Sequence, residues 1–79
     1  DHSHYFFAPN ILVLNDVKNK LISLYPFPKA ENITTKGLKW SLIKENLEIT
    51  NRIGTRNFAQ ENSVTIEFDT GNLVVFIGN

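Results

Sequence analysis

Apolar and polar positions alternate on both sides of residues 69–72, near the end of the chain. The alternating apolar residues are Val64, Ile66 and Phe68 before this stretch and Leu73, Val75 and Ile77 after it. A period of two residues is typical of a β-strand with one buried face. The sequence Asp-Thr-Gly-Asn between the two runs contains the residue types that tight turns require. The pattern therefore predicts a β-hairpin whose apolar residues share one face.

Two further apolar runs occupy residues 11–14 and 21–25. The first is apolar at every position, which predicts a central strand covered on both faces. The polar residues between the two runs favour a second hairpin. Pro26 and Pro28 lack a backbone donor, and we expect them to end the second strand.

The pattern in residues 38–53 fits two secondary structures. A strand would place Trp40 on one face with two leucines, whereas a helix over residues 38–47 would place apolar residues three, four and seven positions apart. Residues 47–53 alternate cleanly, so a third hairpin is favoured. Phe58, in the following loop, is expected to anchor that loop in the core.

These patterns predict an all-β fold, a small antiparallel sandwich or partly open barrel of about six strands in three consecutive hairpins. Curling into such a shape limits the exposed edges that a short chain would otherwise carry. The alternative is an α+β fold in which residues 38–47 are helical. Residues 1–79 are expected to form a single β-rich domain with a flexible arm at residues 1–5.

The composition narrows the classes of partner. The 79 residues include no Cys, so the chain has neither disulfides nor a thiolate metal site. Eight basic and eight acidic residues cancel, which argues against nucleic acid as a partner and favours a protein partner or self-association. No apolar run reaches the length of about 18 residues that a membrane-spanning helix needs.

The chain contains no Met and starts at Asp1. Because translation starts with Met, we expect the polypeptide to be a processed or excised part of a larger protein. Export and organelle import are both compatible with such processing. The compartment is therefore left open.

No residues predict catalysis or a cofactor. Nucleophilic catalysis needs an activated side chain with a base in reach, and both histidines, His2 and His4, lie in the terminal arm. These two histidines are the sole metal candidates, and an arm without further ligands does not predict a metal site. The sequence therefore predicts a protein that is not an enzyme.

Two apolar residues of the last strand, Val74 and Phe76, project away from its core face. An apolar strand face near a terminus is typical of a docking surface, and Phe6 and Phe7 could contribute to it. The predicted function is a non-catalytic protein–protein interaction or structural module.

A different set of side chains supports an alternative function. Trp40, Tyr25, Phe27 and Arg52 combine aromatic faces with a cation, and small β-barrels use such groups to stack on ligands. The alternative is a barrel that binds single-stranded nucleic acid or carbohydrate.

Overall fold

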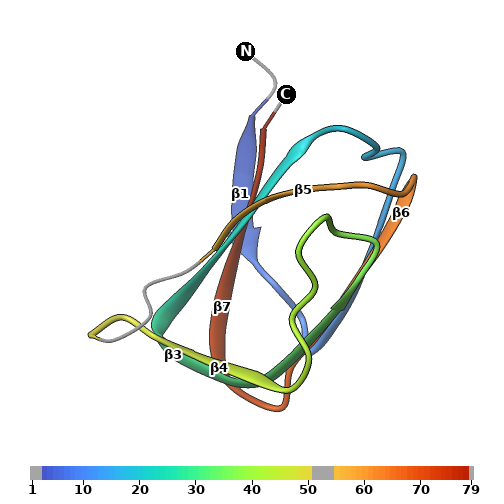
Figure 1. Ribbon diagram of the computed structural model, residues 1–79. Helices are drawn as coiled ribbons and strands as arrows, with labels where there is room; N and C mark the ends of the chain where they lie inside the picture. Colours follow the sequence, from blue (N-terminus) through green and yellow to red (C-terminus); the bar gives the residue numbers. More distant parts are fainter. Residues whose placement is uncertain (1–2, 51–54, 79) are drawn as a thin grey trace.

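The computed structural model describes residues 3–50 and 55–78 and, within these ranges, contains β-strands and no helix (Figure 1). No helix that could cross a membrane is found in this part of the chain. The predicted all-β fold is confirmed, and the α+β alternative is wrong because residues 38–44 are irregular. The strands are β1 (His4–Phe7), β2 (Ile11–Asn15), β3 (Leu21–Lys36), β4 (Glu45–Glu48), β5 (Thr55–Phe58), β6 (Ser63–Glu67) and β7 (Thr70–Ile77).

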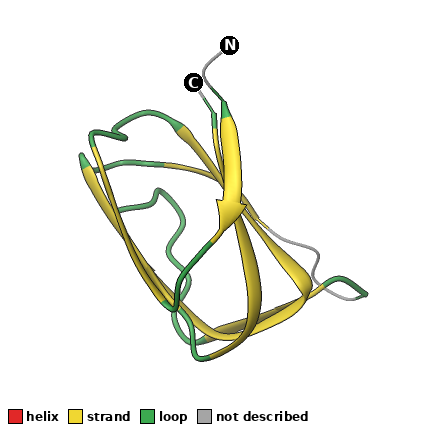
Figure 2. Ribbon diagram, turned by 180° about the vertical axis from the view of Figure 1, so that it is seen from behind, coloured by secondary structure: helices red, strands yellow, loops and turns green. Residues whose placement is uncertain are grey.

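Strand β3, with 16 residues, is the centre of the sheet. It pairs with β7, β4, β5 and β6, while β1 extends the sheet beyond β7 and β2 extends it beyond β6. Every pair is antiparallel. The result is a curled sheet that resembles a half-open barrel, with β1 and β7 side by side at the two chain ends (Figures 1 and 2).

Strand β3 continues through Pro26 and Pro28, so the prediction that these prolines end a strand is wrong. The register with β7 shifts between Pro26 and Ala30. A bulge tolerates residues that cannot donate a ladder hydrogen bond. The carbonyl of Pro28 accepts a hydrogen bond from the Ile49 N–H at 2.8 Å. The strand bends in this region and passes from one side of the barrel to the other (Figure 1).

The last two strands have the predicted buried faces but do not pair with each other. Strand β6 pairs with β2 and the end of β3, and β7 pairs with β1 and the earlier part of β3. The connection between them stays alongside β3, because Thr70 pairs with Glu31, Glu67 pairs with Thr34, and the N–H of Asp69 donates to the Glu31 carbonyl at 3.0 Å. Strands β6 and β7 therefore follow each other along β3, and the predicted hairpin between them is wrong.

The other predicted hairpins are also replaced by longer-range pairings. Strand β2 pairs with β6 and not with β3. As the edge strand it leaves Ile11 and Val13 exposed, at 66% and 55%, so the expected covering of both faces is wrong. Strand β4 pairs with β3 instead of with residues 38–42. His4 and Tyr5, expected in a flexible arm, belong to β1 and pair with β7.

One apolar cluster fills the inside of the curl. Each of its strand residues comes from the inward face of a strand, and Leu38 and Leu42 are added by the segment after β3. This segment lies on the concave side of the sheet in both views (Figures 1 and 2). Its leucines are buried, at 3% and 4% exposure, and they cover the side that the strands leave open.

Gly71 at the start of β7 is the position least able to accept a side chain. Its φ is +91°, and an added Cβ would collide with the Lys29 carbonyl oxygen and lie 2.9 Å from the Ala30 Cα. Both are backbone atoms of β3. We expect Gly71→Ala to lower the free energy of unfolding in urea by roughly 1–3 kcal/mol or more, because strained φ values cost about that much. Asn72→Ala, at an exposed neighbour, is the control and should change it little; equal stability of the two variants would contradict this assignment.

Candidate functional site

The segment after β3 presents Trp40 to solvent. Trp40 is 54% exposed, whereas Leu38 and Leu42 on either side of it are buried. Leu38 pairs with Ala59 in an isolated bridge. Thr35 donates its N–H to the Leu42 carbonyl, and its hydroxyl oxygen accepts the Leu42 N–H, each at 2.9 Å. The segment is therefore fixed at both ends, and the expectation that Trp40 shares a face with the two leucines is wrong.

Asn57 of β5 holds the backbone of Trp40. Its side chain is almost fully buried, with 1% exposed. The Asn57 Oδ1 accepts the Trp40 N–H at 3.0 Å and the Phe58 N–H at 2.9 Å, and its Nδ2 donates to the Trp40 carbonyl at 2.6 Å. A buried amide that makes three hydrogen bonds is a strong local constraint. The position of the indole therefore depends on Asn57.

Phe58 and Lys39 border the Trp40 ring. The Phe58 and Trp40 ring centroids are 6.4 Å apart with the planes tilted by 55°, and the Lys39 Nζ is 4.8 Å from the Trp40 centroid. We call these three residues the Trp40 platform. Phe58 is 40% exposed, so the prediction that it anchors a loop in the core is wrong. Side chains alternate along β5, and Asn57 takes the inward position.

A small hollow adjoins the Trp40 platform. Its volume is about 330 Å³, and it is lined by Asn19, Lys39, Phe58, Ala59 and Gln60. Lys39 and Phe58 belong to both the hollow and the platform. The site thus combines aromatic faces with amide and ammonium groups, which is the mixture expected where a small polar aromatic molecule binds.

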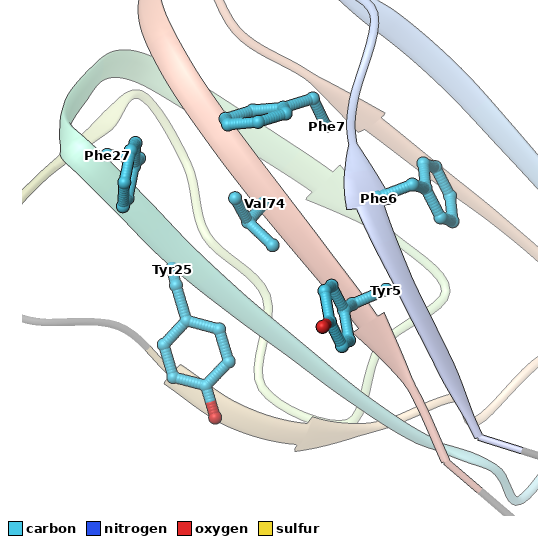
Figure 3. Close-up of a pocket in the computed structure, with 6 residues that line it drawn as sticks. All are labelled: Tyr5, Phe6, Phe7, Tyr25, Phe27 and Val74. Atoms are coloured by element: carbon cyan, nitrogen blue, oxygen red, sulfur yellow. The ribbon is translucent and has the colours of Figure 1, made fainter.

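A second aromatic surface lies on the outer face of β1, β7 and β3 (Figure 3). We call it the aromatic hollow; its volume is about 520 Å³, and it is lined by Tyr5, Phe6, Phe7, Tyr25, Phe27 and Val74. The Phe7 and Phe27 rings meet edge to face, with centroids 5.8 Å apart. Apart from two tyrosine hydroxyls, its side chains are apolar.

The aromatic hollow contains most of the residues expected to bind a partner. Val74 and Phe76 are half-buried, and β1 places Phe7 beside Val74 and Tyr5 beside Phe76. Phe6 points away from Tyr5 and Phe7 across β1 (Figure 3) and packs partly against the core. Binding of a protein partner there stays a prediction.

The residues of the alternative ligand set are divided between the two surfaces. Tyr25 and Phe27 line the aromatic hollow, which does not include Trp40. Arg52 lies outside the described residues. His2 does too, and the His4 ring stacks on Phe6 with centroids 6.1 Å apart. Residues 3–50 and 55–78 contain no cluster of three or more side chains that could hold a metal ion.

The family model for the vitamin B1 binding domain of thiamin pyrophosphokinase matches residues 10–73, which is most of the chain. The chain belongs to this family. No curated protein sequence matches it significantly.

Solved thiamin pyrophosphokinases share the fold of this family member. The enzyme of Geobacillus thermodenitrificans superposes with a TM-score of 0.86 at 18% identity, and that of Bacillus subtilis with 0.83 at 20%. A thiamin pyrophosphokinase family protein of Enterococcus faecalis gives 0.69 at 22%. Each match covers 98% of this chain but only 36–37% of the other protein. The chain thus spans little more than a third of the length of these proteins.

Membership in the vitamin B1 binding family corrects the predicted function. A non-catalytic interaction or structural module was expected, and the family is instead one of ligand-binding domains associated with an enzyme. The alternative prediction, a barrel that binds single-stranded nucleic acid or carbohydrate, is corrected as well, because the family is described as binding vitamin B1. The expectation that the protein is not an enzyme is corrected in one respect, because the domain belongs to an enzyme-associated family.

Sequence reasoning identified Trp40 but missed the groups that position it. Asn57 lies in a polar stretch of the sequence, and nothing local distinguishes it from the many asparagines at turns. A signal was available in the alternation around it, because Asn57 and Ala59 fall on one side and Phe58 on the other. Reading Phe58 as apolar and therefore buried hid that signal.

Replacing Asn57 tests how the Trp40 platform is held. Asn57→Ala removes three hydrogen bonds, so we expect the free energy of unfolding to fall by about 1–3 kcal/mol, the cost of leaving polar groups unpaired. Hydrogen exchange of the Trp40 amide should accelerate more than that of amides in β7. Asn62→Ala, at an exposed asparagine, is the matched control. Unchanged exchange at Trp40 in a destabilised Asn57→Ala protein would show that the amide is held by other contacts.

Proposed function

We propose that this chain binds thiamin at the Trp40 platform and does not itself carry out pyrophosphoryl transfer. The observation that supports this most directly is an exposed tryptophan fixed by a buried asparagine, within the segment that matches a vitamin B1 binding family. Large exposed aromatic side chains are usual at binding sites, where they contribute stacking area.

The chemistry of thiamin suits the groups at the platform. Thiamin joins a flat aminopyrimidine to a positively charged thiazolium ring. The face of an indole attracts both a stacked ring and a cation, because its quadrupole is negative above the ring plane. Asn19 and Gln60 in the adjoining hollow add side-chain amides, which can donate to and accept from the aminopyrimidine.

The rigidity of the Trp40 segment supports the same role. An aromatic group that is already fixed loses little conformational entropy when a ligand stacks on it. Trp40 is held through its backbone by Asn57, and Leu42 on its other side is held by Thr35. The backbone that carries Trp40 is thus organised before the ligand arrives.

The aromatic hollow is the weaker candidate for thiamin. Four of its six lining residues lie outside residues 10–73, the part that matches the family: Tyr5, Phe6, Phe7 and Val74. Its lining offers two hydroxyls as the polar side-chain groups, whereas a heteroaromatic ligand needs several placed donors and acceptors. The Trp40 platform and its neighbouring hollow lie entirely within the matched residues.

For these 79 residues we propose binding of thiamin only, without transfer of a pyrophosphoryl group. Transfer of a phosphoryl group depends on a loop that cradles phosphates and on carboxylates that hold Mg²⁺. The four glycines of this chain are isolated from one another and form no phosphate-binding motif. The structures that share the fold are named as thiamin pyrophosphokinases or as a member of that family, and the matched part is 37% or less of each.

Calorimetric titration with thiamin tests the proposal. We expect saturable binding to the wild-type chain and a loss of about five- to 150-fold in affinity in Trp40→Ala, since stacking on an aromatic side chain contributes about 1–3 kcal/mol. Phe27→Ala, which removes a ring of similar exposure from the aromatic hollow, is the control and should bind normally. Loss of binding in Phe27→Ala with retention in Trp40→Ala would move the site to the aromatic hollow, and no binding to the wild-type chain would contradict the proposal.

A further inference from the structure

The ammonium group of Lys39 already occupies one side of the Trp40 ring. Its Nζ is 4.8 Å from the ring centroid, inside the limit of about 6 Å for a cation–π contact. The backbone of both residues is fixed, because the Lys39 N–H donates to the Phe58 carbonyl at 2.9 Å and Asn57 holds Trp40. The backbone that carries the contact is therefore fixed, while the Lys39 side chain can still turn.

We propose that Lys39 is an internal competitor: its ammonium group occupies the indole surface on which the ligand stacks and has to move away when the ligand binds. This inference rests on the proposed binding of thiamin at Trp40. In this role Lys39 lowers the affinity for the ligand, whereas a lysine that contacts the ligand would raise it.

Crowding around the ring supports displacement. Phe58 borders Trp40 with a centroid distance of 6.4 Å and the Lys39 ammonium group lies over the ring, so a planar ligand can stack on that ring face only if the ammonium group leaves. The Phe58 side chain turns about two torsions only and its N–H is bonded to Asn57. Lys39 has four side-chain torsions and an exposed head, so it is the group that can move.

The structure also provides a place for the displaced ammonium group. Lys39 lines the adjoining hollow of about 330 Å³ together with Asn19 and Gln60. The side-chain carbonyl oxygens of these two residues are acceptors for an ammonium group. Lys39 can therefore turn from the ring to these oxygens, while the NH₂ groups of the same amides stay available to the aminopyrimidine.

Removing the Lys39 charge should tighten binding. A cation–π contact at an exposed site is worth an amount that corresponds to about a two- to fivefold change in a dissociation constant. Lys39→Met keeps the length of the side chain but not the charge, so we expect it to bind thiamin two- to fivefold more tightly in calorimetry. The neutral pyrimidine half of thiamin, 4-amino-5-hydroxymethyl-2-methylpyrimidine, should gain a similar factor because it also needs the ring surface.

Two comparisons separate displacement from simple repulsion between charges. Lys44→Met removes the same charge from the same segment and should leave the affinity for either compound unchanged. Repulsion would instead strengthen binding of the cationic compound alone, would appear in Lys44→Met as well, and would vanish at 1 M salt, where the Debye length is about 3 Å. That result, or weaker binding of thiamin by Lys39→Met, would overturn the proposal.

Proton NMR follows the displacement directly. The ε-methylene protons of Lys39 lie near the indole and should be shifted upfield by its ring current in the free protein. Saturation with thiamin should return them to the position seen in Trp40→Ala, which has no ring at this position. An upfield shift that persists in the saturated complex overturns the Lys39 proposal while leaving thiamin binding intact, whereas failure of the wild-type chain to bind thiamin removes the proposed function itself.

Discussion

The whole structure depends on a single strand that serves two sides of the barrel. Strand β3 pairs with β7 and β5 in its first half, with β4 near its bend and with β6 at its end. Its inward residues Ile22, Leu24 and Ile33 are fully buried. Antiparallel ladders alone would allow a flat sheet, which a chain of 79 residues could not protect from solvent. The bend between Pro26 and Ala30 lets the same strand close the core from two directions.

The candidate site follows from the way this core is closed. The strands leave one side open, and the segment after β3 covers it with Leu38 and Leu42. A segment without a continuous ladder must satisfy its backbone groups in other ways. Thr35 and Asn57 do so with buried side chains, at 3% and 1% exposure, and their hydrogen bonds turn Trp40 outward. The exposed indole is thus a consequence of two buried polar residues.

Alternation along the chain predicted which side chains are buried but not which strands are neighbours. Ile66 and Val75, for example, were correctly assigned to the core face, yet they pair with Thr35 and Leu24 of β3 and not with each other. The alternation shows which face of a strand is buried, but any two inward apolar faces can pack together. It therefore does not identify the pairing partner, and pairing with the next strand in the sequence was simply assumed. For Trp40 the alternation failed to predict burial, because its alternation with two buried leucines suggested a strand and a buried ring. The position of Trp40 depends on Asn57, 17 residues away, and local sequence does not contain that information.

The two aromatic surfaces differ in the polar groups that they offer to a ligand. Tyr25 and Phe27 belong to β3, where the backbone groups pair with neighbouring strands, so a ligand in the aromatic hollow would meet mostly apolar side chains. Trp40 lies on a loop, where polar side chains from three segments converge. A molecule that carries both a ring and hydrogen-bonding groups needs the second kind of surface. Aromatic content alone would favour the hollow, and it is the distribution of polar groups that favours the loop as the place where a vitamin is recognised.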